Sequence, residues 1–175
     1  MNITIIGGGK LGENIALNLL KNERNSITII EKDYEKSLDL SEKLEVNILN
    51  GDASEPIFLS SAGIEDTDIF IITTGKDEIN FICTEIITKL FNYERLVVRV
   101  NNPKNRQIFE KTGAHTLVYA TDVIANFILT DINPFLEDLK NIYDINILHE
   151  EVHWSNPDKI QTQKYQYINT NKNKK

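Results

Sequence analysis

The stretch Ile3-Thr4-Ile5-Ile6-Gly7-Gly8-Gly9-Lys10-Leu11-Gly12 decides the fold class of this chain, because a strand-like run leads directly into a G-x-G-x-x-G motif that opens an amphipathic helix. Gly7 permits a tight turn, Gly9 lets the backbone approach a pyrophosphate, and Gly12 lets the helix pack closely on the strand. The helix N-terminus adds unpaired N–H groups and a positive potential. Lys10 either reaches the same phosphate or is simply solvated. The stretch predicts a phosphate-binding loop in a Rossmann-like unit.

An acidic residue at the expected distance extends this motif. Glu31 ends the second predicted strand, 19 residues beyond Gly12, at about the position where a carboxylate receives the ribose hydroxyls. Its negative charge disfavours a 2′-phosphate, so NAD, NADH or an adenosine nucleotide is favoured over NADP. The positive charge of the neighbouring Lys32 would instead attract a 2′-phosphate and weakens this preference. A glycine turn and a strand-end glutamate without any ligand are the alternative interpretation.

The rest of the chain alternates between strand-length apolar stretches and helical stretches, which is typical of βαβ units and a parallel sheet. Several of the apolar stretches are rich in Ile and Val on both faces, as expected in the middle of a covered sheet. With right-handed crossovers, the pattern predicts an α/β fold built on a Rossmann-like doubly wound parallel sheet. The predicted strands are residues 3–6, 26–31, 46–49, 68–73, 95–100 and 116–119.

Helix boundaries are marked by residues with known positional preferences. Asp33 suits the N-cap of the second helix, and Asp77 begins a longer helix after the fourth strand. Pro103 opens another helix in its first turn, and Gly113 ends it. The connection between the third and fourth strands is short.

The carboxyl ends of the strands in such a sheet meet at one crevice. Asp52 and Ala53 follow the third strand, and Thr73 and Thr74 lie at the end of the fourth. Asp52 has an alternative role as a helix or turn cap. Arg99 places a charge inside an apolar run, which is costly unless a phosphate or an aspartate pairs with it. The predicted nucleotide-binding residues are therefore Gly7, Gly8, Gly9, Lys10, Leu11, Gly12, Glu31, Asp52, Ala53, Thr73, Thr74 and Arg99.

The length of 175 residues fits one ordinary domain with a tail, without room for a second full-sized catalytic domain. We expect a nucleotide-binding domain over residues 1–133 and a short α/β extension over residues 134–158. A polar, basic and disordered tail is expected over residues 159–175. The last helix of the domain begins near Asp122, and Pro134 is expected to interrupt it. Residues 135–143 suit a short helix, and residues 145–154 alternate enough to form a strand.

Charge and composition narrow the function classes. The net charge is −7, and because the tail carries five lysines and no acid, the remaining residues hold −12, the difference between −7 and +5. An acidic body argues against nucleic acid as the main partner. The lone Cys83 permits no internal disulfide. No signal peptide and no apolar run of about 20 residues is visible, so a cytoplasmic, non-embedded chain is expected.

Several further motifs resemble the regulator-of-potassium-conductance (RCK) family, specifically the N-terminal nucleotide-binding domain of Trk and Ktr potassium-uptake regulators. The resemblance covers residues 1–132. Besides the glycine loop it rests on Glu31-Lys32-Asp33, Asn50-Gly51-Asp52-Ala53-Ser54, Ala62-Gly63-Ile64, Thr73-Thr74-Gly75-Lys76-Asp77-Glu78-Ile79-Asn80, Arg99-Val100-Asn101-Asn102-Pro103 and Gly113-Ala114.

The resemblance implies a cytoplasmic regulatory subunit that lies at the inner face of the membrane through its partner. Such a subunit binds NAD(H) or ATP/ADP, forms homodimers or rings, and controls a membrane potassium translocator. The family's binding positions carry over to Gly7–Leu11, Glu31, Asp52, Thr73, Thr74 and Arg99. Channel-type members use acidic residues on the fifth strand for calcium, where this chain has Arg99 and Asn101, so no metal site is expected.

Two alternative functions stay open at this point. A small NAD-dependent oxidoreductase would need a substrate domain and an acid or base beside the nicotinamide, and no such catalytic pair is visible. A nucleotide-independent assembly module would use the helix near residues 122–132 as a dimer contact. The sequence His149-Glu150-Glu151-Val152-His153 matches H-E-x-x-H, but its strand-like flanks and the missing third ligand argue against a zinc site.

Overall fold

The computed structural model describes the backbone of residues 1–143 and the side chains of residues 1–130 and 132. The chain divides into two compact units, Met1–Ala125 and Asn126–Lys175. The first unit contains a six-stranded parallel sheet with the strand order β3-β2-β1-β4-β5-β6. This order is that of a doubly wound dinucleotide-binding fold, whose ligand crevice opens between β1 and β4. The strands are β1 Asn2–Ile6, β2 Ser26–Glu31, β3 Asn47–Asn50, β4 Ile69–Ile72, β5 Arg95–Val100 and β6 Thr116–Tyr119.

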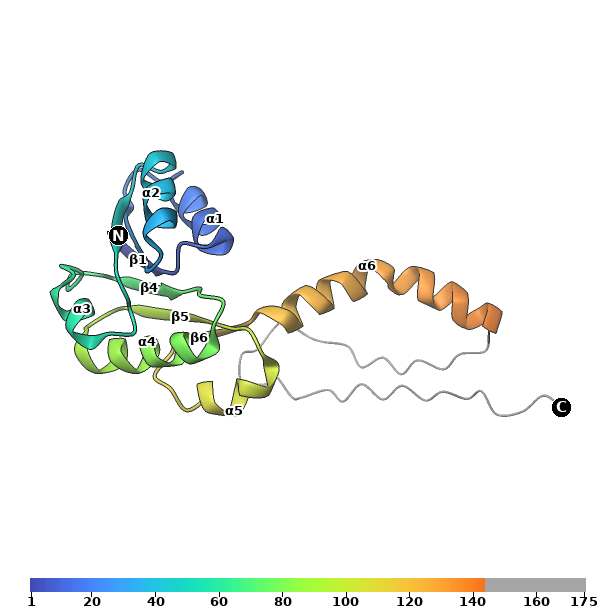
Figure 1. Ribbon diagram of the computed structural model, residues 1–175. Coiled ribbons are helices and arrows are strands. Elements are labelled where there is room, and N and C mark those ends of the chain that lie inside the picture. The colour runs from blue at the N-terminus through green and yellow to red at the C-terminus, as the bar shows by residue number, and fades with distance from the viewer. Residues whose placement is uncertain (144–175) are drawn as a thin grey trace. The chain divides into compact units, whose positions relative to one another are not determined.

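The helices of the first unit cover both faces of the sheet (Figure 1). One core cluster joins α1 and α2 to β1 and β2, with Ile5 and Ile29 fully buried. The other joins α3, α4 and α5 to β4 and β5, with Phe70 and Val98 fully buried. The helical segments are α1 Lys10–Leu19, α2 Tyr34–Lys43, α3 Pro56–Ser61, α4 Asp77–Leu90, the 3₁₀ turn η1 Pro103–Asn105, α5 Arg106–Phe109 and α6 Ala120–Tyr143.

The predicted α/β class and doubly wound parallel sheet are confirmed. The continuous apolar runs that predicted the strands reflect burial on both faces of the sheet. Ile5 and Ile6, for example, point to opposite faces and are both buried, as expected in a covered parallel sheet. Asp33 caps α2, with its side chain accepting a hydrogen bond from the Lys36 backbone N–H at 3.1 Å. Asp77 is the first residue of α4, as predicted.

Two helix predictions are wrong. The helix expected from Pro103 to Gly113 is a 3₁₀ turn followed by the four residues of α5. The interruption expected at Pro134 does not occur, because α6 runs unbroken from Ala120 to Tyr143. A proline inside a helix removes one backbone hydrogen bond and adds local strain, but it does not end α6 here.

The remaining expectations for the C-terminal part lie largely outside the described residues. These are the strand at 145–154, the His149/His153 pair and the tail from 159. The domain boundaries at 133 and 158 stay predictions, and α6 continues across the first of them. Among the described residues, no helix combines the length and the apolar character that crossing a bilayer requires.

Candidate nucleotide-binding site

The glycine loop lies at the carboxyl end of β1, where the strand order reverses. Gly7 has a φ of 103°, and its N–H donates to the carbonyl of Ile30 at 2.9 Å, which fixes the start of the turn. A β-carbon on Gly12 would lie 2.0 Å from the Gly7 carbonyl oxygen. Only glycine therefore permits this contact between α1 and the loop that precedes it.

Gly9 has a different environment from the other two motif glycines. It is the N-cap of α1, in an extended conformation and without a side-chain cap hydrogen bond. A β-carbon at Gly9 would meet no protein atom within 4 Å. Packing inside the chain therefore does not explain a glycine here, whereas a ligand approaching the first amides of α1 would.

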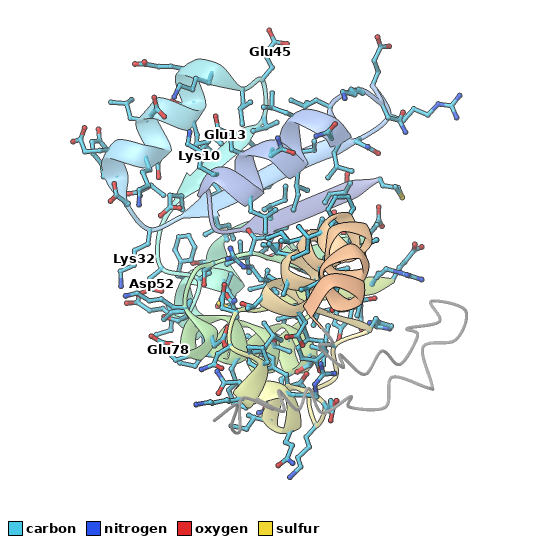
Figure 2. All side chains as sticks on the ribbon, turned by 90° about the vertical axis from the view of Figure 1, so that its right-hand side faces the viewer. Lys10, Glu13, Lys32, Glu45, Asp52 and Glu78 are labelled. Atoms are coloured by element: carbon cyan, nitrogen blue, oxygen red, sulfur yellow. The ribbon has the colours of Figure 1, made fainter. Side chains whose placement is uncertain are left out.

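The two residues that follow Gly9 lie at the surface. The Lys10 side chain is 91% exposed and its ammonium lies 3.1 Å from a carboxylate oxygen of Glu13 (Figure 2). Leu11 is 42% exposed. Both residues border the open N-terminus of α1, and a phosphate contact by Lys10 stays a prediction.

Glu31 lies at the end of β2 and holds two backbone segments together. One carboxylate oxygen accepts a hydrogen bond from the Gly8 N–H at 2.8 Å, and the other accepts one from the Asp33 N–H at 2.9 Å. The carboxylate is thereby fixed against the glycine loop. A carboxylate has further lone pairs available, so the same group can receive the hydroxyls of a ribose.

Asp52 lies in the turn after β3, and a lysine and a serine hold its carboxylate. One of its oxygens pairs with the ammonium of Lys32, and the other accepts hydrogen bonds from the Ser54 backbone N–H at 2.9 Å and the Ser54 hydroxyl at 2.6 Å. The hydrogen bond from Lys32 and those from Ser54 lower the pKa of Asp52 to about 2. Ala53 is buried in the core beside it, so its side chain packs inside the domain.

Thr73 and Thr74 connect the end of β4 to the glycine loop and to α4. The Thr73 hydroxyl lies 3.1 Å from the Gly7 carbonyl and 3.2 Å from the Ile6 carbonyl, which accept its hydrogen bond. The Thr74 hydroxyl donates to the side chain of Asn80. Both hydroxyls are thus used within the protein, and the backbone beside them lies next to Gly7.

Arg99 on β5 is partly buried and has no carboxylate partner among the described residues. One terminal nitrogen donates to the Thr73 carbonyl at 3.3 Å, and Nε is buried without a hydrogen-bond partner. Of the two partners considered, a phosphate or an aspartate, the aspartate is not found, since no ion pair of Arg99 occurs within the described part of the chain. Through Thr73, this guanidinium is connected to the glycine loop, and its contact with an anionic ligand stays a prediction.

Three residues that were not predicted as site residues hold the ends of β4 and β5 together. The fully buried Asn80 donates to the carbonyls of Thr74 at 3.1 Å and Arg99 at 2.9 Å. Asn101 also donates to the Thr74 carbonyl, at 3.1 Å. Asp77 accepts from the backbone and side chain of Asn101 at 2.7 and 2.8 Å.

A polar residue at the first turn of a helix after a strand end is the signal that points to Asn80 and Asp77. Burial by itself opposes ionisation of Asp77, but the hydrogen bonds from Asn101, Asn102 and Asn105 outweigh it and hold its pKa below the ordinary value.

A hollow of about 490 Å³ lies at the opposite end of the sheet. Its lining includes four acidic residues at the amino ends of the strands, Glu65, Asp66, Asp68 and Glu94. Such a surface repels phosphate, so it does not compete with the glycine-loop crevice as a nucleotide site.

Comparisons with known proteins identify the family of this chain. The model of the TrkA-N domain family matches residues 3–120. The chain is 33% identical over 117 residues to the Trk system potassium uptake protein TrkA of Vibrio alginolyticus, which covers 65% of this chain and 25% of the relative. It is 30% identical over 133 residues to the TrkA homolog of Pyrococcus horikoshii, covering 73% and 58%. The chain thus spans a quarter to somewhat over half of the length of these relatives.

Solved structures share the fold. The NAD(P)-binding domain of an exopolyphosphatase-related protein from Archaeoglobus fulgidus has a TM-score of 0.65 at 22% identity, over 75% of this chain and 97% of that one. The GsuK RCK domain has a TM-score of 0.64 at 26% identity, over 84% and 31%. The GsuK channel bound to NAD has a TM-score of 0.65 at 16% identity, over 72% and 22%. Because the family model covers well over half of the chain, the resemblance is confirmed and this chain belongs to the TrkA-N domain family.

Proposed function

We propose that this chain is the nucleotide-sensing domain of a potassium uptake system, which binds NAD(H) or ATP/ADP and controls a membrane potassium translocator. The observation that carries the proposal is the open N-terminus of α1, where a β-carbon at Gly9 would meet no atom of a residue beyond its chain neighbours within 4 Å. This is the place where a Rossmann-type loop receives a pyrophosphate.

The surroundings of the loop support a dinucleotide or an adenosine nucleotide as the ligand. Glu31 is held against the loop with lone pairs to spare, on the side where a ribose would lie. Arg99 offers a guanidinium that lacks a carboxylate partner in the described part of the chain. A ligand that carries both ribose hydroxyls and phosphates would satisfy these groups together.

The names of the relatives support the potassium-transport part of the proposal. Two of them are named Trk system potassium uptake proteins, and one neighbour of similar fold is a channel bound to NAD. We take the regulatory role, and not catalysis, as the function of this chain. We place it in the cytoplasm, at the inner face of the membrane through its translocator partner, as a homodimer or ring.

The physical basis of sensing would be a difference in affinity between two states of the domain. A nucleotide shifts a conformational equilibrium only if it binds one state better than the other. Oxidised and reduced NAD, or ATP and ADP, would then report different metabolic conditions because they fit the crevice differently. No separate chemical step on a substrate is needed for this role.

Calorimetric titration of the full chain with NAD, NADH, ATP and ADP tests the nucleotide part. We expect at least one of them to bind, and Gly9→Ser to abolish binding because the added atoms occupy the phosphate position. Serine is a favourable N-cap residue, so this variant should keep its thermal stability. Asp39→Asn, which removes the acid of the exposed Lys43–Asp39 pair on α2, serves as a comparison that keeps measurable binding. Absence of binding by all four nucleotides would overturn the proposal.

Co-purification tests the transport part. The tagged chain, expressed in its native host, should retain a potassium-transport membrane protein in detergent, and deletion of its gene should change potassium uptake. Normal uptake in the deletion strain together with no membrane partner would contradict the regulatory role. Turnover of a hydroxy acid with NAD would instead support the oxidoreductase alternative.

A further inference from the structure

An ion pair joins the ends of two neighbouring strands, β2 and β3, next to Glu31, the residue proposed to receive the ribose. Lys32 follows Glu31 directly at the end of β2, and Asp52 lies in the turn after β3. The Lys32 ammonium pairs with one carboxylate oxygen of Asp52, and the two side chains lie together at the edge of the molecule in Figure 2.

The position of Lys32 makes this pair relevant to nucleotide choice. In dinucleotide-binding folds the acid at the end of the second strand receives the 2′-hydroxyl, and a cation beside it accommodates a 2′-phosphate. Lys32 stands at the right place to be that cation. In this chain, however, its charge is already matched by Asp52.

The charges of this corner sum to a negative value. Glu31 and Asp52 each carry one negative charge and Lys32 one positive charge, and Asp33 is engaged as the N-cap of α2. Asp52 cannot easily turn away, because its other oxygen is held by the backbone and the hydroxyl of Ser54. A 2′-phosphate would therefore meet two carboxylates and one engaged lysine.

We propose that the Lys32–Asp52 ion pair makes this site select nucleotides with a free 2′-hydroxyl and reject 2′-phosphorylated ones. The inference rests on the proposed nucleotide-binding function. It assigns to Asp52 the role of a specificity residue that acts by withholding Lys32 from the ligand. Without Asp52, the same lysine would favour a 2′-phosphate, since one repulsive charge is removed and one cation is released.

Two ligand pairs that differ only in the 2′-phosphate provide the measurement. NADH is compared with NADPH, and AMP with adenosine 2′,5′-bisphosphate, each titrated against the full chain. The readout is the affinity ratio within a pair, so a change in contacts to the adenine or the pyrophosphate cancels. We expect the wild-type chain to favour the unphosphorylated member by about tenfold or more.

Asp52→Asn tests the role of the pair, and it keeps an oxygen that can accept from Ser54. We expect this variant to reduce the preference by about tenfold. Adding Lys32→Gln to Asp52→Asn should restore most of the preference, because the released cation is gone. Asp39→Asn, which removes the acid of the exposed Lys43–Asp39 pair on α2, is the matched control and should leave the ratio unchanged.

The outcomes separate the two proposals. Equal wild-type affinities within each pair, or an unchanged ratio in Asp52→Asn, would overturn the inference and leave the nucleotide-sensing function standing. A ratio that shifts equally in Asp39→Asn would also overturn it, since the effect would then be one of net charge alone. If none of the four ligands binds, and NAD, ATP and ADP do not bind either, the proposed function fails and the inference with it.

Discussion

At the scale of single residues, two glycines of one loop are expected to respond differently to substitution. A β-carbon at Gly12 would lie 2.0 Å from the Gly7 carbonyl oxygen, whereas one at Gly9 would meet no protein atom within 4 Å. Gly12→Ala should therefore lower the free energy of unfolding by about 1–3 kcal/mol, the usual cost of overpacking. Gly9→Ser should change it by much less. Urea denaturation of both variants measures the free energy of unfolding. Equal losses would contradict the different surroundings of Gly9 and Gly12.

Asp52 should make stability depend on pH in the acidic range. Its pKa is about 2 in the folded chain, against an ordinary value of 3.8. A depressed carboxylate pKa stabilises the fold above the unfolded-state value, and the contribution is lost as the pH falls through the folded-state value. The difference in unfolding free energy between the wild type and Asp52→Asn should therefore shrink from about pH 5 to about pH 2, by about 1 kcal/mol because solvent screens the exposed Lys32 ammonium. Urea titrations across this range measure it, and a constant difference would contradict the described hydrogen bonds.

At the scale of elements, the first turn of α4 joins the ends of β4 and β5. Asp77 accepts hydrogen bonds from the backbone N–H groups of Asn101 and Asn102 and from the side chain of Asn105, at 2.7, 2.9 and 2.7 Å. Asp77→Ala leaves these partly buried donors unpaired and should lower the free energy of unfolding by about 2–4 kcal/mol.

Glu78 is the matched control for this prediction. It belongs to the same first helical turn and is exposed, so Glu78→Ala removes a similar charge from the N-terminus of α4 without breaking the Asp77 hydrogen bonds. We expect it to change stability by less than about 1 kcal/mol. If Asp77→Ala and Glu78→Ala lower the free energy of unfolding equally, the helix dipole, and not the hydrogen bonds, accounts for the contribution of Asp77 to stability.

The elements also show which features the sequence could predict. The loop, the strands and the acid at Glu31 follow from local patterns, namely apolar runs on both faces, glycine spacing and a strand end. The Lys32–Asp52 pair and the contacts of Asn80 do not, because they join residues that are distant in sequence and meet only in the folded sheet. The break expected at Pro134 was wrong, because proline disfavours the interior of a helix without forbidding it and so does not locate the end of α6.

At the scale of the whole molecule, the two halves of the sheet meet at the glycine loop. Thr73 at the end of β4 donates its backbone N–H to the Ile6 carbonyl at 2.9 Å, and its hydroxyl contacts the carbonyl of Gly7. Arg99, from β5, reaches the Thr73 carbonyl. A nucleotide bound at the glycine loop would thus lie beside residues from both halves of the sheet.

Self-association is the prediction that concerns the complete chain. α6 carries exposed apolar side chains at helical spacing, with exposed fractions of 60% for Ile124, 81% for Phe127 and 56% for Ile128. Such a face is self-complementary in a symmetric dimer, so we expect a dimer in sedimentation velocity and a monomer for Phe127→Glu. Ile57→Glu on α3, where the isoleucine is 84% exposed, is the matched control and should remain dimeric. A monomeric wild type, or equal dissociation of both variants, would show that α6 does not pair with a second copy.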